Sequence, residues 1–178
     1  FAEAFVNAGM AVFMFNYSGF GQSEGNTAFL VNPFMHVQDW ESALAYVKQK
    51  EGVNPQRIAL WGSSFSGGHV LSLAADHPEI RAVSAQVPFL DGIPTAMQTS
   101  PMVMIKSTWA AIKDVFRKLT FRSPYYIAVV GKPGDTACMN KDDSEAGFRN
   151  LIPNIERQQW RNLCPARIAF ILPFYRPI

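Results

Sequence analysis

The chain has few cysteines, few histidines and no long apolar run. Its 178 residues include 2 cysteines, which lack the spacing of a metal-binding pair. This excludes a disulfide framework or a zinc site as the basis of the fold and favours a reducing, cytoplasmic compartment. The longest apolar run, residues 8–15, is broken by Gly9 and is far shorter than the roughly 20 residues of a membrane-spanning helix. We therefore expect a protein in solution that holds no metal.

The charge is also small. The net charge of +2 gives no support to nucleic-acid binding. The one basic cluster, at Lys113, Arg117, Lys118 and Arg122, is typical of a solvated helix face. A composition of 48% hydrophobic and 17% charged residues indicates a globular domain. The N-terminus has neither an initiator methionine nor the layout of a signal peptide.

The first half of the chain alternates between helix and strand patterns. Apolar runs at 10–15, 57–61 and 80–87 predict strands buried on both faces. Helix patterns precede or separate them, at 1–8, from Pro33 to about residue 50, and from the turn after residue 61 to about His77. The alternation predicts an α/β fold with three layers, in which a doubly wound, mainly parallel sheet lies between helices.

From about residue 91 the alternation is lost and prolines recur. An amphipathic pattern predicts a helix of about four turns, with one apolar side made by Val103, Trp109, Ile112, Phe116 and Leu119. A strand-like run follows at 125–130. We therefore divide the chain into a core, residues 1–91, and an inserted, mainly helical cap, residues 92–178.

The most informative segment is the glycine-bracketed turn at 62–68, between an apolar strand and a helix. Such a turn exposes a serine hydroxyl and directs the next backbone N–H at the oxygen of a substrate carbonyl. Two frames fit, one centred on Ser64 and one on Ser66. We choose Ser64 as nucleophile and Phe65 as backbone oxyanion donor, because Gly62 then stands at the end of the strand. The alternative is a tight turn whose serine only caps the helix.

This turn and its surroundings resemble the α/β-hydrolase superfamily, close to serine aminopeptidases, dipeptidyl-peptidase-like enzymes and acyl esterases. The matching segments are 16–25, 54–65 and 85–89. The resemblance implies a serine hydrolase that acts on a small-molecule ester or peptide without a cofactor. Two departures in these segments accompany it: Asn16 and Ser18 replace the usual aspartate and arginine, and Ser66 replaces the second glycine of the turn.

The resemblance also implies a catalytic acid and a histidine after the serine, which the chain does not supply clearly. His36, His69 and His77 are the only histidines, and we expect each on a helix surface or at a helix end. Asp135 and Asp91 are weak candidates for the acid, since each follows a predicted strand. The sequence therefore looks like a fragment cut at both ends, with the missing catalytic groups outside it.

Two other readings stay open. The chain could be a non-catalytic binding module with the same fold, or the segment from Pro101 to Arg122 could associate with a membrane surface, although such a pattern more often marks a helix packed on its own domain. An apolar acyl pocket would draw on Met97, Met102, Met104, Trp109 and Phe116. We predict neither a membrane nor a nucleic-acid partner, and the sequence does not indicate an oligomeric state.

Overall fold

The computed structural model describes residues 1–152 and 160–177, which form two compact units. Unit 1 comprises Phe1–Asn26, Pro33–Leu90 and the chain from Arg176 on. Unit 2 comprises Thr27–Asn32 and Asp91–Tyr175. Each unit is therefore assembled from separate stretches of the chain.

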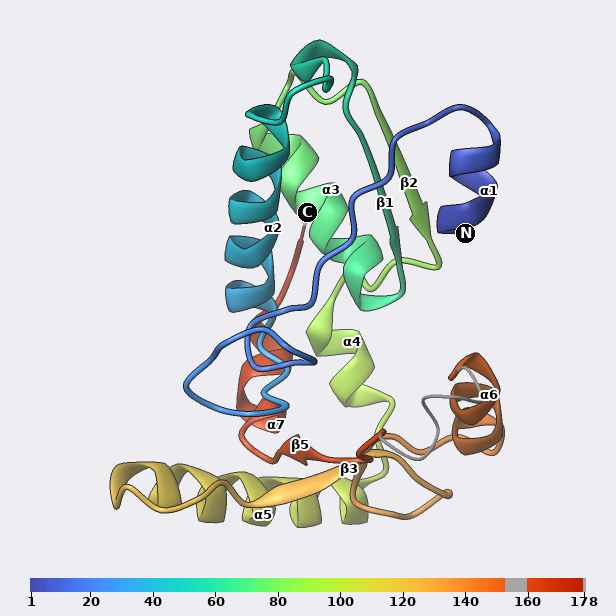
Figure 1. The fold of residues 1–178 in the computed structure, drawn as a ribbon. Coiled ribbons are helices and arrows are strands. Elements are labelled where there is room, and N and C mark those ends of the chain that lie inside the picture. Colours follow the sequence, from blue (N-terminus) through green and yellow to red (C-terminus); the bar gives the residue numbers. More distant parts are fainter. Residues whose placement is uncertain (153–159, 178) are drawn as a thin grey trace. The chain divides into compact units, whose positions relative to one another are not determined.

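Unit 1 is a pair of parallel strands with helices on both faces. Its elements are α1 (Ala2–Asn7), α2 (Pro33–Lys48), the 3₁₀ helix η1 (Pro55–Arg57), β1 (Ala59–Ser63), α3 (Phe65–Asp76) and β2 (Ala82–Gln86). In the β1–β2 pair, Leu60 lies opposite Val83, and α3 connects the two strands. Helices α2 and α3 lie side by side (Figure 1). On the other side of β1, the Trp61 ring lies 4.6 Å from the Phe1 ring, beside α1.

The core of unit 1 forms where the predicted apolar faces meet. Helix α2 begins at Pro33 as expected, and Leu44 from it packs with residues of β1, α3 and the segment before β1. The buried members of this cluster are Leu44, Ile58, Leu60, Val70 and Leu73. Burial of these side chains, each contributing about 1.5–3 kcal/mol, fixes the strand against the two helices.

The prediction of a strand at residues 10–15 is wrong. Within the described residues it has no strand hydrogen bonds, and several of its side chains are open to solvent, Met14 at 73%. An apolar run becomes a strand only when a neighbouring strand supplies partners for its N–H and C=O groups. The two paired strands match the other predictions to within two residues at each end.

Unit 2 mixes helices with a small sheet. Its elements are α4 (Gly92–Met97), α5 (Pro101–Leu119), β3 (Tyr126–Val130), β4 (Ala137–Met139), α6 (Ser144–Leu151), β5 (Cys164–Pro165), α7 (Ile168–Ile171) and the 3₁₀ helix η2 (Leu172–Phe174). The strand order is β4-β3-β5, with β3 parallel to β4 and antiparallel to β5. The expectation of a mainly helical second half missed the short strands β4 and β5.

The long helix α5 is packed through a different face from the one predicted. Val103, Ala110, Ala111 and Asp114 are buried, and Ala110 belongs to a core cluster with Ile127, Cys164, Ala166 and Ile168. The predicted apolar side placed Val103 with Trp109. Six residues correspond to about 600° of rotation, so the two side chains lie about 120° apart around the helix.

Asp114 forms the polar centre of unit 2. Its side chain has 0% exposure, and Arg167 donates to it from Nε at 2.7 Å, from Nη2 at 3.2 Å and from the backbone N at 2.9 Å. The backbone N–H of Tyr125 donates a fourth bond, at 2.9 Å. One carboxylate thus ties α5 to the start of β3 and to the segment before α7.

Candidate functional site

The turn at Ser64 is strained and tightly held. Ser64 follows β1 directly and precedes α3, with φ 53° and ψ −115°. A positive φ of this kind costs a residue other than glycine about 1–3 kcal/mol, so the surroundings must impose it. The Ser64 N–H donates to the Gln86 carbonyl at 2.8 Å, and the Ser64 carbonyl accepts from the N–H of Phe89 at 2.9 Å. The last residue of β2 and the segment after it therefore both hold the turn in place.

The glycines of this turn allow strand and helix to approach each other closely. A Cβ atom on Gly62 would lie 2.4 Å from the Ser66 carbonyl oxygen, and one on Gly68 would lie 2.4 Å from that of Phe89. Both contacts are with backbone atoms, which have little freedom to move away. Glycine at these two positions is thus a steric requirement of the turn.

The two serine frames have different geometry. Ser64 is exposed and its side chain makes no capping hydrogen bond to α3. Ser66 lies in the first turn of α3, with its Oγ atom 2.6 Å from the Tyr17 hydroxyl. The alternative of a serine that only caps the helix therefore does not fit Ser64. Phe65 is the first residue of α3, and its ring packs 5.3 Å from that of Phe89.

Two of the three histidines are buried next to this turn, against expectation. His69 has 0% exposure and His36 4%. The Tyr17 ring stacks on His36 at a centroid distance of 4.1 Å, and Phe65 lies 4.8 Å from His69. The predicted position of His36 and His69 on helix surfaces is wrong, because both belong to this aromatic cluster. The spacing Phe65, His69, Leu73 puts His69 on the inward stripe of α3, a signal that was present in the sequence.

Tyr17 connects this cluster to the turn. Trp40 donates from Nε1 to the Tyr17 hydroxyl at 2.8 Å, and that hydroxyl bonds to Ser66. Burial raises the pKa of Tyr17. Burial, with a smaller effect of His36, lowers the pKa of His69 to about 3. Both side chains are therefore neutral at neutral pH.

His77 has the predicted helix-end position. It follows α3, with Nε2 2.8 Å from Glu41 and Nδ1 3.0 Å from Glu79. The hydrogen bond to Glu41 is the main cause that raises the pKa of His77. No hydrogen bond joins the Ser64 hydroxyl to a histidine in the part of the chain that the structure describes.

Both candidate acids have turn positions in unit 2. Asp91 caps α4, where its Oδ1 accepts from the Ile93 N–H at 2.9 Å. Asp135 accepts from the Lys132 N–H at 2.9 Å, in the loop between β3 and β4.

Across residues 1–152 and 160–177, the side chains form no group of three or more potential metal ligands. Over the same residues, none of the helices is both long and apolar enough to cross a bilayer.

The buried histidine predicts how stability depends on pH. In the unfolded chain His69 binds a proton near pH 6.5, whereas in the fold it does so near pH 3. Below pH 6.5 the unfolded state therefore binds more protons, so the free energy of unfolding falls, by about 2 kcal/mol between about pH 7 and about pH 5. Urea unfolding at both pH values measures this change.

Two variants test whether His69 causes this loss of stability at low pH. His69→Phe should remove most of the loss, whereas His77→Gln should keep it. His77 acts with the opposite sign, because its raised pKa adds stability at low pH that is lost as pH rises through the folded-state value. An unchanged acid response in His69→Phe would contradict the assignment.

Comparisons with known proteins agree on the family and the fold. The family model "Serine aminopeptidase, S33" matches residues 1–144. The quorum-quenching protein AidA of Acinetobacter baumannii is 36% identical over 154 residues, which cover 86% of this chain and 51% of that protein. The thiohydrolase apmlB of Arthrinium phaeospermum is 29% identical over 160 residues, covering 88% and 51%. The chain thus spans about half the length of these curated relatives.

Solved structures support the same fold. DcsB, solved in complex with its substrate analogue, has a TM-score of 0.76 at 19% identity, covering 99% of this chain and 59% of that one. The α/β-hydrolase GrgF of a Penicillium species has a TM-score of 0.68 at 20% identity, covering 91% and 53%. The predicted α/β-hydrolase fold is confirmed.

Proposed function

Because the chain belongs to the serine aminopeptidase S33 family of α/β-hydrolases, we propose that its parent protein cleaves an ester or amide bond through an acyl-enzyme on Ser64. The observation that carries this proposal is the exposed Ser64 side chain at a strained, left-handed turn between β1 and α3. A fold retains such strain where a site needs it, and a nucleophile elbow is such a site.

The chemistry would follow the serine hydrolase scheme. Ser64 Oγ attacks the substrate carbonyl, a histidine accepts the hydroxyl proton, and the Phe65 backbone N–H stabilises the oxyanion. The leaving alcohol or amine takes that proton, and water then releases the acyl group. We propose that the histidine and the acid come from outside residues 1–178. His77 is bonded to Glu41 and Glu79, whereas His36 and His69 are packed around the Tyr17 ring.

The substrate is proposed as a small-molecule ester or peptide. The thiohydrolase relatives add thioesters to this class, because attack of Ser64 on a thioester expels a thiolate, a good leaving group, and gives the same kind of acyl-enzyme. We also propose a cytoplasmic location. Cys138 and Cys164 support it, since both are free thiols.

A fluorophosphonate probe tests the nucleophile. The protein for this test carries residues 1–178 together with any segments that precede or follow them in its gene. Ser64→Ala should abolish labelling and lower ester hydrolysis at least about 10³-fold. Ser63→Ala is the matched control, because Ser63 is also exposed at the end of β1; it should keep both labelling and hydrolysis.

Two outcomes would count against parts of this proposal. Labelling that survives Ser64→Ala would remove Ser64 as nucleophile. Ester hydrolysis by residues 1–178 alone that is lost in Ser64→Ala would show that the base lies inside the chain.

The alternative function is a non-catalytic binding module, favoured by the absence of a histidine bonded to Ser64 within the described residues. A gene that encodes a strand pattern after residue 178, followed by an aspartate and then by a histidine, would argue against the binding module.

A further inference from the structure

Helix α5 presents an apolar stripe to solvent on the side away from its buried face. The stripe follows spacings of three and four residues, which keep side chains on one side of a helix. Its members are Met102, Ile105, Trp109, Ile112, Phe116 and Leu119, exposed by 45–71%. We call these six residues the outer stripe. Sequence patterning predicted most of them as a packed face, but the structure packs α5 through Val103, Ala110, Ala111 and Asp114 instead.

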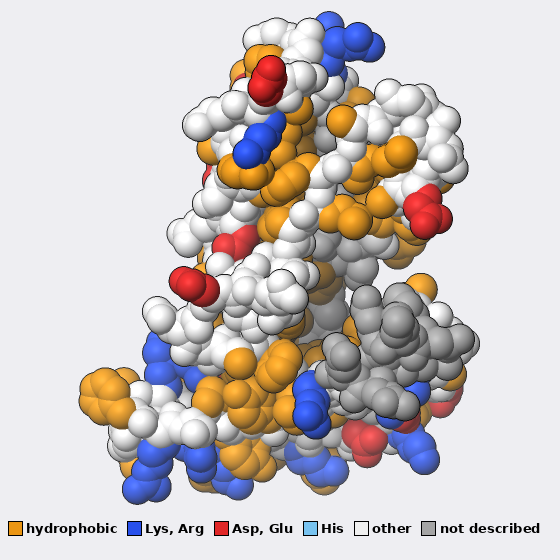
Figure 2. Space-filling model, in the orientation of Figure 1, with side chains coloured by type: hydrophobic (Ala, Val, Ile, Leu, Met, Phe, Trp, Pro, Cys, Tyr) orange, Lys and Arg blue, Asp and Glu red, His pale blue; other side chains and the backbone are white. Residues whose placement is uncertain are grey.

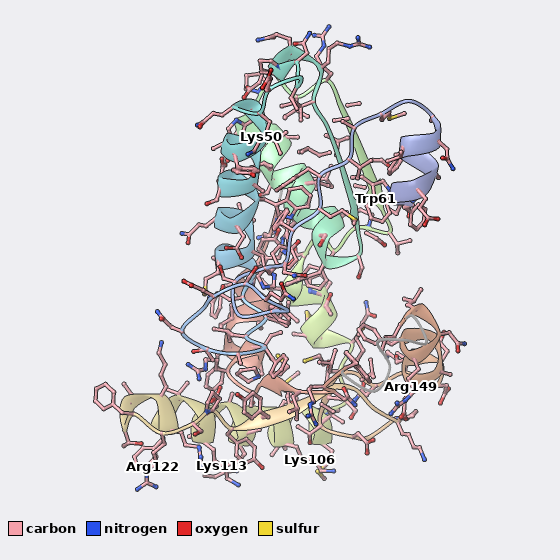
Figure 3. The ribbon with its side chains drawn as sticks, viewed as in Figure 1. Lys50, Trp61, Lys106, Lys113, Arg122 and Arg149 are labelled. Carbon is pink, nitrogen blue, oxygen red and sulfur yellow. The ribbon has the colours of Figure 1, made fainter. Side chains whose placement is uncertain are left out.

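Positive charge follows one border of the outer stripe. Lys106, Lys113 and Arg117 are spaced by seven and four residues, so they lie beside the stripe along the same side of α5. Lys118 and Arg122 add two cations at the C-terminal end. Figure 2 shows Lys and Arg side chains mixed with apolar ones along the edge that α5 forms. Figure 3 shows Lys106 and Lys113 along this helix and Arg122 just past its end.

No exposed negative charge offsets these cations on the helix. The only carboxylate between residues 100 and 122 is Asp114, which is buried and bonded to Arg167. The charged side chains that α5 exposes are thus all cations.

The cations also border a groove with aromatic walls. Lys106, Trp109 and Lys113 line it from α5, and Tyr125 and Tyr126 line it from the chain at β3. The Lys113 Nζ atom lies 5.4 Å from the centre of the Tyr125 ring. Ammonium groups beside indole and phenol rings suit the anionic, partly hydrated head group of a phospholipid, because such rings prefer the boundary between water and hydrocarbon.

Against the expectation from the sequence that the protein has no membrane partner, we propose that this surface of α5 binds the face of an anionic phospholipid membrane. An apolar stripe that contains Trp and Phe, and whose charged neighbours on the helix are Lys and Arg, is the pattern of a helix that lies in the membrane interface. Charge argues against a second copy of the chain. In a two-fold interface formed by α5 against α5, the Lys106, Lys113 and Arg117 borders would come together without carboxylates between them.

Vesicle co-sedimentation tests this proposal with the protein that carries residues 1–178 together with any segments that precede or follow them in its gene. The chain should bind vesicles that mix phosphatidylcholine with phosphatidylglycerol and should bind pure phosphatidylcholine weakly. Lys106→Glu with Lys113→Glu should weaken binding to the mixed vesicles at least about tenfold. Lys132→Glu with Lys141→Glu is the matched control, because it makes the same charge change at exposed positions of unit 2 outside α5. This control variant should bind the mixed vesicles as strongly as the unsubstituted protein does.

A second pair tests the apolar contribution and retains a spectroscopic reporter. Ile105→Ser with Ile112→Ser should reduce vesicle binding while circular dichroism stays unchanged. In the unsubstituted protein, Trp109 emission should shift to shorter wavelength on vesicle binding, and Trp109→Phe should lose that shift. Equal binding to both vesicle types would overturn the proposal. Lipid-free self-association removed by the Ile105/Ile112 pair would assign the stripe to a second copy instead.

Discussion

Asp114→Ala is expected to lower the free energy of unfolding of unit 2 by about 3–5 kcal/mol. The carboxylate accepts bonds from the Tyr125 N–H, the Arg167 N–H and the Arg167 guanidinium, and its side chain is fully buried. Alanine would leave the guanidinium, of which 9% of the side chain is exposed, without its counter-charge. A buried charge that has lost its partner is the main source of this penalty.

Urea unfolding followed by circular dichroism measures the loss, and hydrogen exchange localises it. The Tyr125 and Arg167 amides should exchange faster in Asp114→Ala. Glu145→Ala is the control, because Glu145 pairs with Arg149 on the surface of α6, and exposed pairs contribute little. Similar losses in the two variants would show that the buried Asp114–Arg167 pair contributes no more to stability than the exposed Glu145–Arg149 pair.

Gly92→Ala is the second substitution with a large expected effect, a loss of about 3 kcal/mol. A Cβ atom at this position would lie 1.9 Å from the Leu172 carbonyl oxygen and 2.8 Å from the Pro173 Cα atom. The Gly92 N–H donates to the Tyr175 carbonyl at 3.0 Å, which holds α4 and η2 at this spacing. The added methyl group would force the two backbones apart.

Gly147→Ala is the matched control. Gly147 lies inside α6, and nothing lies within 4 Å of a Cβ atom added there. Alanine is a better helix former than glycine, so this variant should gain about 0.5–1 kcal/mol. Thermal unfolding of the two variants should shift in opposite directions. A stabilised or unchanged Gly92→Ala would show that α4 and η2 can separate freely.

The sequence was most informative where structure depends on neighbours along the chain. The strand β1, the turn at Ser64 and helix α3 are contiguous, and Gly62 lies where strand and helix cross. The start of α2 at Pro33 is similarly local, because its fixed φ angle suits a first helical position. These features were confirmed in place, although the catalytic role of Ser64 stays a proposal.

Features that depend on distant segments could not be read from local patterns. The extended run at 10–15 lacks the ladder that its composition suggested, because a strand requires a partner. His36 and His69 are separated by 33 residues and meet only when α2 packs on α3. The packed face of α5 was predicted wrongly because its polar anchor, Asp114, is buried through a bond to Arg167, which lies 53 residues further along the chain.

The path of the chain limits how the protein can be divided for experiments. Unit 2 takes Thr27–Asn32 from upstream, and Val31 of that stretch packs against its core. A recombinant fragment that starts at Asp91 would lose this contact, and one that stops at Leu90 would lose the stretch of unit 1 that begins at Arg176. During synthesis, unit 1 therefore stays unfinished until unit 2 has been made. A cleaner separation would excise the 91–175 stretch and join its neighbours with a short flexible linker.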